Sequence, residues 1–134
     1  MIMKLITRDT DYALRALCFI SRSNAGKFSV TKLSKELGMP RPFLRKILQA
    51  LNKQKILEST RGKVGGFILA KDPRKIFLTD IIRIFQGRLK LNECLLNKLI
   101  CPDQRTCLLR KMLVKIERYV LKELDSITIA SLLK

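Results

Sequence analysis

Two short helical patterns, separated by a tight turn, constrain this 134-residue sequence more than any other feature. Two leucines four residues apart predict a helix over 31–37, and Gly38 is the residue type that ends helices. Pro40 and Pro42 suit a turn and the first positions of a second helix. In that helix the apolar positions recur at i, i+1, i+4, i+5 and i+8: Phe43, Leu44, Ile47, Leu48 and Leu51. This spacing predicts one buried face, and two helices joined by a tight turn form a helix-turn-helix.

The opposite face of the second helix carries hydrogen-bond donors and no acid: Arg41, Arg45, Lys46, Gln49, Asn52 and Lys53. Arg and Gln pair bidentately with guanine and adenine in the major groove of DNA, and Lys binds phosphates. A solvated face that happens to be basic is the alternative interpretation. The hairpin predicted after this helix favours the DNA-binding interpretation.

A glycine-rich hairpin is predicted directly after the helix-turn-helix. Strands over 56–61 and 67–70 flank three glycines in five residues, and Arg61 and Lys63 lie at the predicted tip. Such a hairpin is a wing, whose cations can follow the DNA backbone or enter the minor groove. Gly65 and Gly66 could also serve the turn alone.

Three further helices complete the predicted fold, over 9–21, 79–86 and 108–132. The last would be about 37 Å long, and its apolar stripe is longer than so small a domain can cover. We therefore expect a second copy to pack against it across a two-fold axis. The fold class is mainly α with a small β-hairpin wing, a winged helix-turn-helix with a long C-terminal dimerisation helix. One compact unit is expected: 1–88 for DNA binding, a cysteine loop over 89–107, and the dimerisation helix over 108–134.

The charge of the chain indicates a polyanionic partner. Lys and Arg number 28 against 11 Asp and Glu, a net charge of +17, and there is no histidine. Binding of cations to nucleic acid is driven by counterion release. An anionic membrane surface or ribosomal RNA would satisfy the charge equally well. The missing histidine excludes Ser-His-Asp and Cys-His catalysis, and no phosphate loop or carboxylate pair occurs, so we do not expect an enzyme.

No stretch approaches the roughly 20 apolar residues that a membrane span requires. The longest uncharged run, Ser126 to Leu133, has eight residues, and Met1 to Thr10 lacks the apolar core of a signal peptide. We expect a cytoplasmic protein with no membrane partner.

Three of the four cysteines are clustered as Cys94-x6-Cys101-x5-Cys107, whereas Cys18 is expected to be a small buried apolar residue of the first helix. Cytoplasmic chains do not keep structural disulfides, so the cluster suggests a metal or redox site. Its spacing is too wide for CxxC zinc sites and one ligand short of four. An iron–sulfur cluster is favoured over zinc, and both over a bare thiol sensor or three semi-buried cysteines.

The chain resembles the IscR/NsrR-type iron–sulfur transcriptional regulators, which are winged helix-turn-helix dimers. The resemblance covers nearly the whole chain and rests on Asp11-Tyr12-Ala13-Leu14-Arg15, the helix-turn-helix over 33–51, the wing over 61–67, the segment 76–82 and the cysteine triplet. It implies that Cys94, Cys101 and Cys107 ligate a 4Fe-4S cluster, or a 2Fe-2S cluster, near the dimer interface.

The same resemblance suggests a fourth ligand. Some members use a histidine after the third cysteine, which this chain lacks. The nitric-oxide-sensing members use an aspartate of the first helix from the other subunit, and Asp11 matches that position. This favours a 4Fe-4S cluster. Asp11 could instead stabilise the helix N-terminus and pair with Arg15. Glu93, Asp9, Asp103 or a small molecule are alternative ligands.

These observations predict a homodimeric, sequence-specific DNA-binding transcriptional regulator, a repressor, that senses nitric oxide, redox or iron–sulfur status. A metal-free winged-helix regulator that signals by thiol oxidation is the first alternative. A non-specific nucleic-acid-binding protein, for which the charge alone would suffice, is the second.

Overall fold

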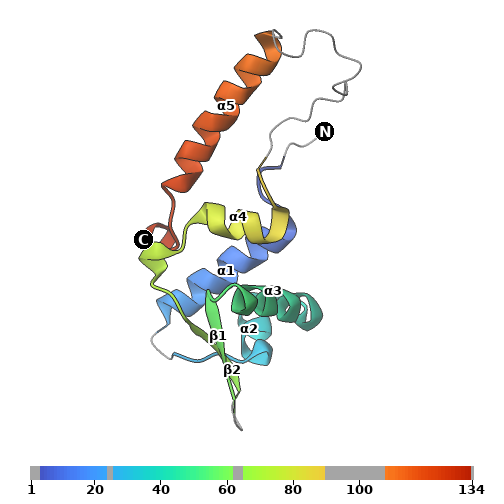
Figure 1. The fold of residues 1–134 in the computed structure, drawn as a ribbon. Coiled ribbons are helices and arrows are strands. Elements are labelled where there is room, and N and C mark those ends of the chain that lie inside the picture. The colour runs from blue at the N-terminus through green and yellow to red at the C-terminus, as the bar shows by residue number, and fades with distance from the viewer. Residues whose placement is uncertain (1–3, 24–25, 62–64, 90–107, 134) are drawn as a thin grey trace.

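The computed structural model describes residues 4–23, 26–61, 65–89 and 108–133. It is mainly helical with one small antiparallel hairpin, as the sequence predicts (Figure 1). In chain order the elements are α1 (Arg8–Arg22), α2 (Val30–Leu37), α3 (Arg41–Lys53), β1 (Leu57–Thr60), β2 (Gly66–Leu69), η1 (Pro73–Lys75), α4 (Leu78–Gln86), α5 (Leu108–Asp125) and η2 (Ala130–Leu133).

Local signals set the ends of the first helices. The Thr7 side chain caps α1 by accepting from the backbone N–H of Thr10, and Ser29 caps α2 in the same way. Gly38 ends α2 in the left-handed conformation, with φ of 66°. The cap at Ser29 and the stop at Gly38 explain why α2 is found within one residue of its expected range, 31–37.

The core of the domain is formed where α1, α2 and α3 meet the base of the hairpin. Its fully buried side chains include Leu17, Leu33, Leu44, Leu48 and Leu51. Four of the five apolar positions predicted for α3 are buried. Phe43 is the exception, with 50% of its surface exposed. It lies at the edge of the apolar arc in the first turn, so the prediction that it is buried was wrong.

The hairpin is the predicted wing, which we define as 57–69. β1 and β2 pair antiparallel, and Ser59 lies opposite Phe67. β2 also bridges to Phe28, which exchanges two backbone hydrogen bonds of 3.0 and 2.7 Å with Phe67. The wing is thereby fastened to the segment just before α2, on the side away from its partner strand.

Helix α4 packs on α1 and α5. Thr10 donates a 2.7 Å hydrogen bond to the Gln86 side-chain oxygen, and the Gln86 amide donates to the carbonyl of Leu5. The C-terminus of α4 is therefore tied to the start of α1. Ile81 and Ile82 of α4 are buried.

The C-terminal helix is shorter than predicted. α5 ends at Asp125 instead of reaching 132, which makes it about 27 Å long. The chain then returns to the domain, where the Ile129 N–H donates to the carbonyl of Ile76 and the Leu78 N–H donates to the carbonyl of Ile127. Ile129 is fully buried in the core. A tertiary contact ends the helix here, because burial of Ile129 competes with continuation of the helical pattern.

Up to Asp125, α5 extends away from the domain (Figure 1). Five of its large apolar side chains are exposed: Leu108, Leu109, Met112, Ile116 and Tyr119. With 100° per residue, all five fall within an arc of about 100° on one side of the helix.

Candidate nucleic-acid interface

The solvent side of α3 is a basic surface without acids. Its base is held by the buried Leu44, Ile47, Leu48 and Leu51, so the opposite side is turned outward. An open hollow on that side is lined by Arg41, Pro42, Arg45, Lys46 and Gln49, all exposed. Four of the six donors predicted on this face, Arg41, Arg45, Lys46 and Gln49, thus lie together on one surface.

A groove of about 280 Å³ lies between α3 and the wing. Its lining consists of Val30, Arg45, Gln49, Ser59, Thr60, Gly65, Gly66 and Phe67. Arg45 and Gln49 therefore border both the open hollow and the groove. A strand of nucleic acid lying along α3 would meet these two side chains and the hydroxyls of β1 together.

Ser59 and Thr60 were not predicted as part of this surface. Ser59 is exposed, and Thr60 donates its hydroxyl hydrogen to the carbonyl of Gly66 while accepting from the Gly66 N–H. A signal was present in the sequence, since Ser and Thr are common phosphate-binding residues. Placing them beside α3 required the tertiary fold.

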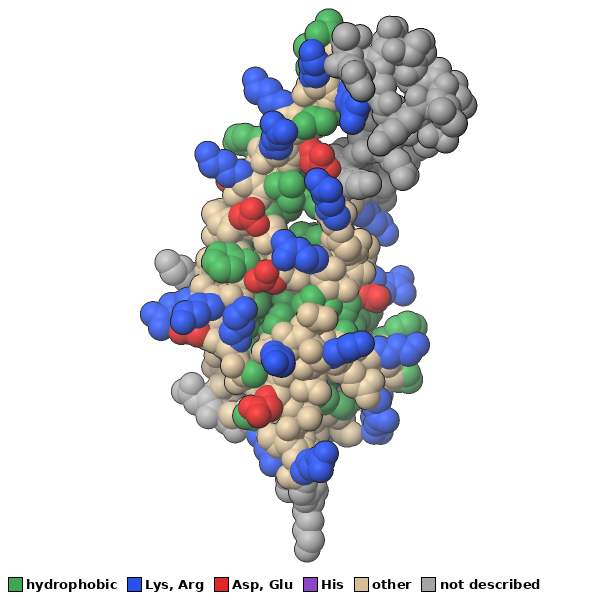
Figure 2. All heavy atoms as spheres, in the orientation of Figure 1, with side chains coloured by type: hydrophobic (Ala, Val, Ile, Leu, Met, Phe, Trp, Pro, Cys, Tyr) green, Lys and Arg blue, Asp and Glu red, His purple; other side chains and the backbone are tan. Residues whose placement is uncertain are grey.

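The tip of the wing, 62–64, lies outside the described residues. Arg61 is exposed at the end of β1, whereas Lys63 lies outside the described residues. Figure 2 shows Lys and Arg side chains spread over one face of the molecule, along both α5 and the domain, with fewer Asp and Glu among them. On this face the basic side chains of the described residues are thus not confined to α3.

The predicted metal site is only partly described. Cys94, Cys101 and Cys107 lie outside the described residues, and within the described part no group of three possible ligands occurs. Asp11 is on α1, with 46% of its side chain exposed, and its Oδ2 accepts a 2.9 Å hydrogen bond from Arg15 Nε. The predicted pairing of Asp11 with Arg15 is confirmed.

Cys18, the remaining cysteine, packs against the core from α1 and is half-buried. Burial raises the pKa of its thiol, and the nearby Arg22 opposes that rise. The expected apolar role of Cys18 agrees with this placement.

Comparison with known proteins identifies the family. A match to Rrf2, described as iron-dependent transcriptional regulators, covers residues 6–134. The chain belongs to the Rrf2 family. It is therefore a transcriptional regulator with a DNA-binding winged-helix fold, and not an enzyme.

Similar proteins and a solved structure support that assignment. A putative helix-turn-helix regulator of Aquifex aeolicus is 38% identical over 92 residues, 69% of this chain and 64% of the relative's length. An Rrf2-like regulator of Rhodobacter capsulatus is 28% identical over 138 residues, 96% of this chain and 92% of the relative. The solved structure of T. potens IscR is 27% identical, covers 96% of this chain and 85% of that chain, and has a TM-score of 0.74.

None of the described helices is long and apolar enough to span a membrane.

Proposed function

We propose that this Rrf2 chain is a homodimeric, sequence-specific repressor whose affinity for DNA responds to an iron–sulfur cluster. The observation that carries the DNA-binding part is the acid-free side of α3, where Arg45 and Gln49 border both the open hollow and the wing groove. Arg45 and Gln49 would read base edges in the major groove, and Arg41 and Lys46 would contact phosphates. In the wing, Arg61 and Lys63 would contact the backbone or the minor groove.

Two substitutions distinguish base reading from charge attraction. Arg45→Ala is expected to cost about 1–3 kcal/mol on the preferred site and to reduce discrimination among sites. Lys63→Ala is expected to weaken binding to all sequences alike and to lower the salt slope by about one. Binding isotherms over a range of salt, on the preferred site and on scrambled DNA, measure both. Equal loss on every sequence for Arg45→Ala would refute base reading and favour a non-specific binder.

The dimer is proposed from the exposed stripe on α5. No described residue covers the exposed apolar side chains of α5. Packing two such helices together would remove these side chains from water. A two-fold pair also suits DNA, because two recognition helices then reach half-sites a helical turn or a multiple apart. Ile116→Glu is expected to give monomers in analytical ultracentrifugation. Arg118→Glu, exposed on another side of α5, is the matched control and should leave the dimer intact.

For the cluster we propose Cys94, Cys101 and Cys107 with Asp11 of the second subunit, favouring 4Fe-4S over 2Fe-2S. Thiolates are the usual ligands of such clusters, and one other ligand is tolerated. Asp11 fits this role, because its carboxylate is half-exposed and its described hydrogen bond uses Oδ2 alone. When bound, a cluster supplies iron that reacts with nitric oxide or oxygen.

The chain's own residues supply a route from Asp11 to DNA. Asp11 lies next to Thr10, which is hydrogen-bonded to Gln86, and α1 packs directly on α3. Ligation through the other carboxylate oxygen, Oδ1, would hold α1 toward the cluster, and loss of the cluster would release it. A shift of α1 between these states would move α3. Coupling of about 1–3 kcal/mol would change DNA affinity about 5- to 150-fold.

Native mass spectrometry of protein purified without air tests the cluster by counting iron and sulfide per dimer. Asp11→Asn is expected to lower cluster retention on exposure to nitric oxide, whereas Asp9→Asn, two residues earlier on α1, should not. A metal-free dimer with unchanged DNA affinity would refute the cluster and favour the thiol-oxidation alternative. If Asp9→Asn lowers cluster retention and Asp11→Asn does not, Asp9 is the fourth ligand.

A further inference from the structure

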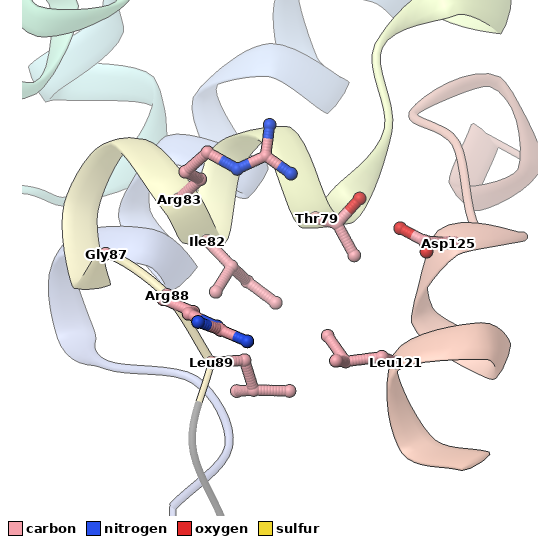
Figure 3. A pocket seen from close by; sticks show the side chains of 8 residues that line it. All are labelled: Thr79, Ile82, Arg83, Gly87, Arg88, Leu89, Leu121 and Asp125. Carbon is pink, nitrogen blue, oxygen red and sulfur yellow. The ribbon is translucent and has the colours of Figure 1, made fainter. Parts of the chain in front are cut away.

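A cavity of about 420 Å³ lies between α4 and α5, away from the surface of α3 (Figure 3). Its lining includes Ile82, Arg83, Arg88, Leu89, Leu121 and Asp125. Cavities of 300–1,000 Å³ with an apolar lining and a few charged groups are typical of small-molecule sites. No part of the proposed DNA or cluster site uses these residues.

The charges around this cavity are unbalanced. Arg83 and Arg88 contribute two guanidinium groups, and Asp125 contributes one carboxylate. No hydrogen bond or ion pair within the described residues involves the side chains of these three. Figure 3 shows the Arg88 side chain directed toward Leu121, with Asp125 across the space next to Thr79. In the same view the Arg83 side chain extends on the other side of Ile82, toward Thr79, so the two guanidinium groups lie apart. Arg88 and Asp125 reach the cavity from different elements, and within the described residues neither is paired with an opposite charge.

Three apolar side chains converge in the middle of the cavity (Figure 3). Ile82 is buried on α4, whereas Leu89 and Leu121 are half-buried and reach the cavity from the end of α4 and from α5. Gly87 makes this arrangement possible, since its φ of 75° with ψ of −155° is a conformation that residues with a Cβ rarely adopt. The chain turns there, and Arg88 and Leu89 line the cavity instead of continuing α4.

We propose that this cavity binds a free α-amino acid with an aliphatic side chain. Arg88 would hold the α-carboxylate, Asp125 the α-ammonium group, and Ile82, Leu89 and Leu121 the side chain. The zwitterion matches both charges at once, which a simple carboxylate or amine cannot do. Because α4 packs on both α1 and α5, an occupied cavity would join the DNA-binding part to the C-terminal helix. The proposed binding requires neither DNA nor a cluster.

Three probes with the same branched alkyl end test the assignment by isothermal calorimetry on the purified 134-residue chain. Leucine carries both charges, 4-methylpentanoate lacks the ammonium group, and 3-methylbutylamine lacks the carboxylate. We expect leucine to bind most tightly and each analogue to bind about tenfold more weakly or worse, as the loss of a charged hydrogen-bonding partner implies.

Variants then locate the binding. Arg88→Gln and Asp125→Asn change exposed side chains at the rim and should weaken leucine about tenfold or more without unfolding the protein. Arg22→Gln removes an exposed arginine outside the cavity and should leave leucine binding unchanged. No binding of any probe at 10 mM, on the order of the weakest affinities that calorimetry resolves, would overturn the proposal. The proposal would also be overturned if leucine and 4-methylpentanoate bound with equal affinity. The same holds if the wild type and Arg88→Gln bound leucine with equal affinity. If leucine does not bind the wild type and Arg88→Gln changes the oligomeric state, the proposal is overturned and the cavity is a contact site for a second copy of the chain.

Discussion

Gly66→Ala tests how the wing is held to the domain. A Cβ at this position would lie 2.5 Å from the carbonyl oxygen of Phe28, 2.7 Å from its carbonyl carbon and 3.1 Å from the nitrogen of Ser29. Favourable carbon contacts lie at roughly 3.5–4.0 Å, so the two backbone segments must separate by about 1 Å. The obstructing atoms are all backbone, and a change of side-chain rotamer cannot relieve the contact.

The cost follows from what that separation would break. Phe28 and Phe67 exchange hydrogen bonds of 3.0 and 2.7 Å, and each is worth about 0.5–1.5 kcal/mol. Loss of both amounts to about 1–3 kcal/mol, the range that overpacking also produces. We expect Gly66→Ala to lower the free energy of unfolding by that amount in urea denaturation. Amide hydrogen exchange should show lost protection at Phe28 and Phe67.

Ser59→Ala provides the control, because Ser59 is exposed on the same hairpin opposite Phe67. Its effect on unfolding should stay within about 0.5 kcal/mol. If Gly66→Ala keeps the stability of the wild type and the protection of both phenylalanine amides, the contact with Phe28 does not hold the wing. The glycine would then serve the turn alone.

Two more predictions concern the tail and a surface ion pair. Ile129→Ala should lower the free energy of unfolding by about 2–5 kcal/mol, because Ile129 is fully buried. Leu132 is 40% exposed, so Leu132→Ala, the control, should lower it by less than about 1 kcal/mol. Equal effects of the two substitutions would contradict the return of the tail to the core. Hydrogen bonds from Arg74 lower the pKa of Asp72 from 3.8 to about 2. The pair therefore stabilises the fold above about pH 4, and this contribution is lost as the pH falls toward 2. Arg74→Gln removes the guanidinium but keeps the backbone N–H of residue 74, which also donates to Asp72. NMR titration should therefore find the Asp72 pKa raised part of the way toward its ordinary value, and an unchanged pKa would show that the Arg74 side chain is not a cause.

Much of the DNA-binding surface could be predicted from the sequence. Helical spacing places Arg45 and Gln49 opposite the buried leucines whatever the surrounding fold, because 3.6 residues per turn set which side chains share a face. The groove beside the wing could not be predicted in this way. Its hydroxyl residues, Ser59 and Thr60, reach α3 through pairing and packing of the hairpin, which no local pattern encodes. The exposure of Phe43 likewise depends on which neighbours cover the first turn.

The cavity between α4 and α5 had no sequence signal at all. Its charged residues, Arg83, Arg88 and Asp125, come from segments about 40 residues apart in the chain and are unremarkable in a sequence so rich in Lys and Arg. Only the packing of α4 on α5, and the turn at Gly87, bring them together.

The sequence by itself determined the helices, the turn at Gly38 and the strongly basic character of the chain. Each of these depends on residues within a few positions of one another, or on composition alone. The tertiary structure decided that Gly66 meets the backbone of Phe28 and that α5 stops at Asp125 while Ile129 enters the core. The reason is that contacts between distant segments compete with local preference, and burial of an apolar side chain outweighs the modest free energy of one more helical turn.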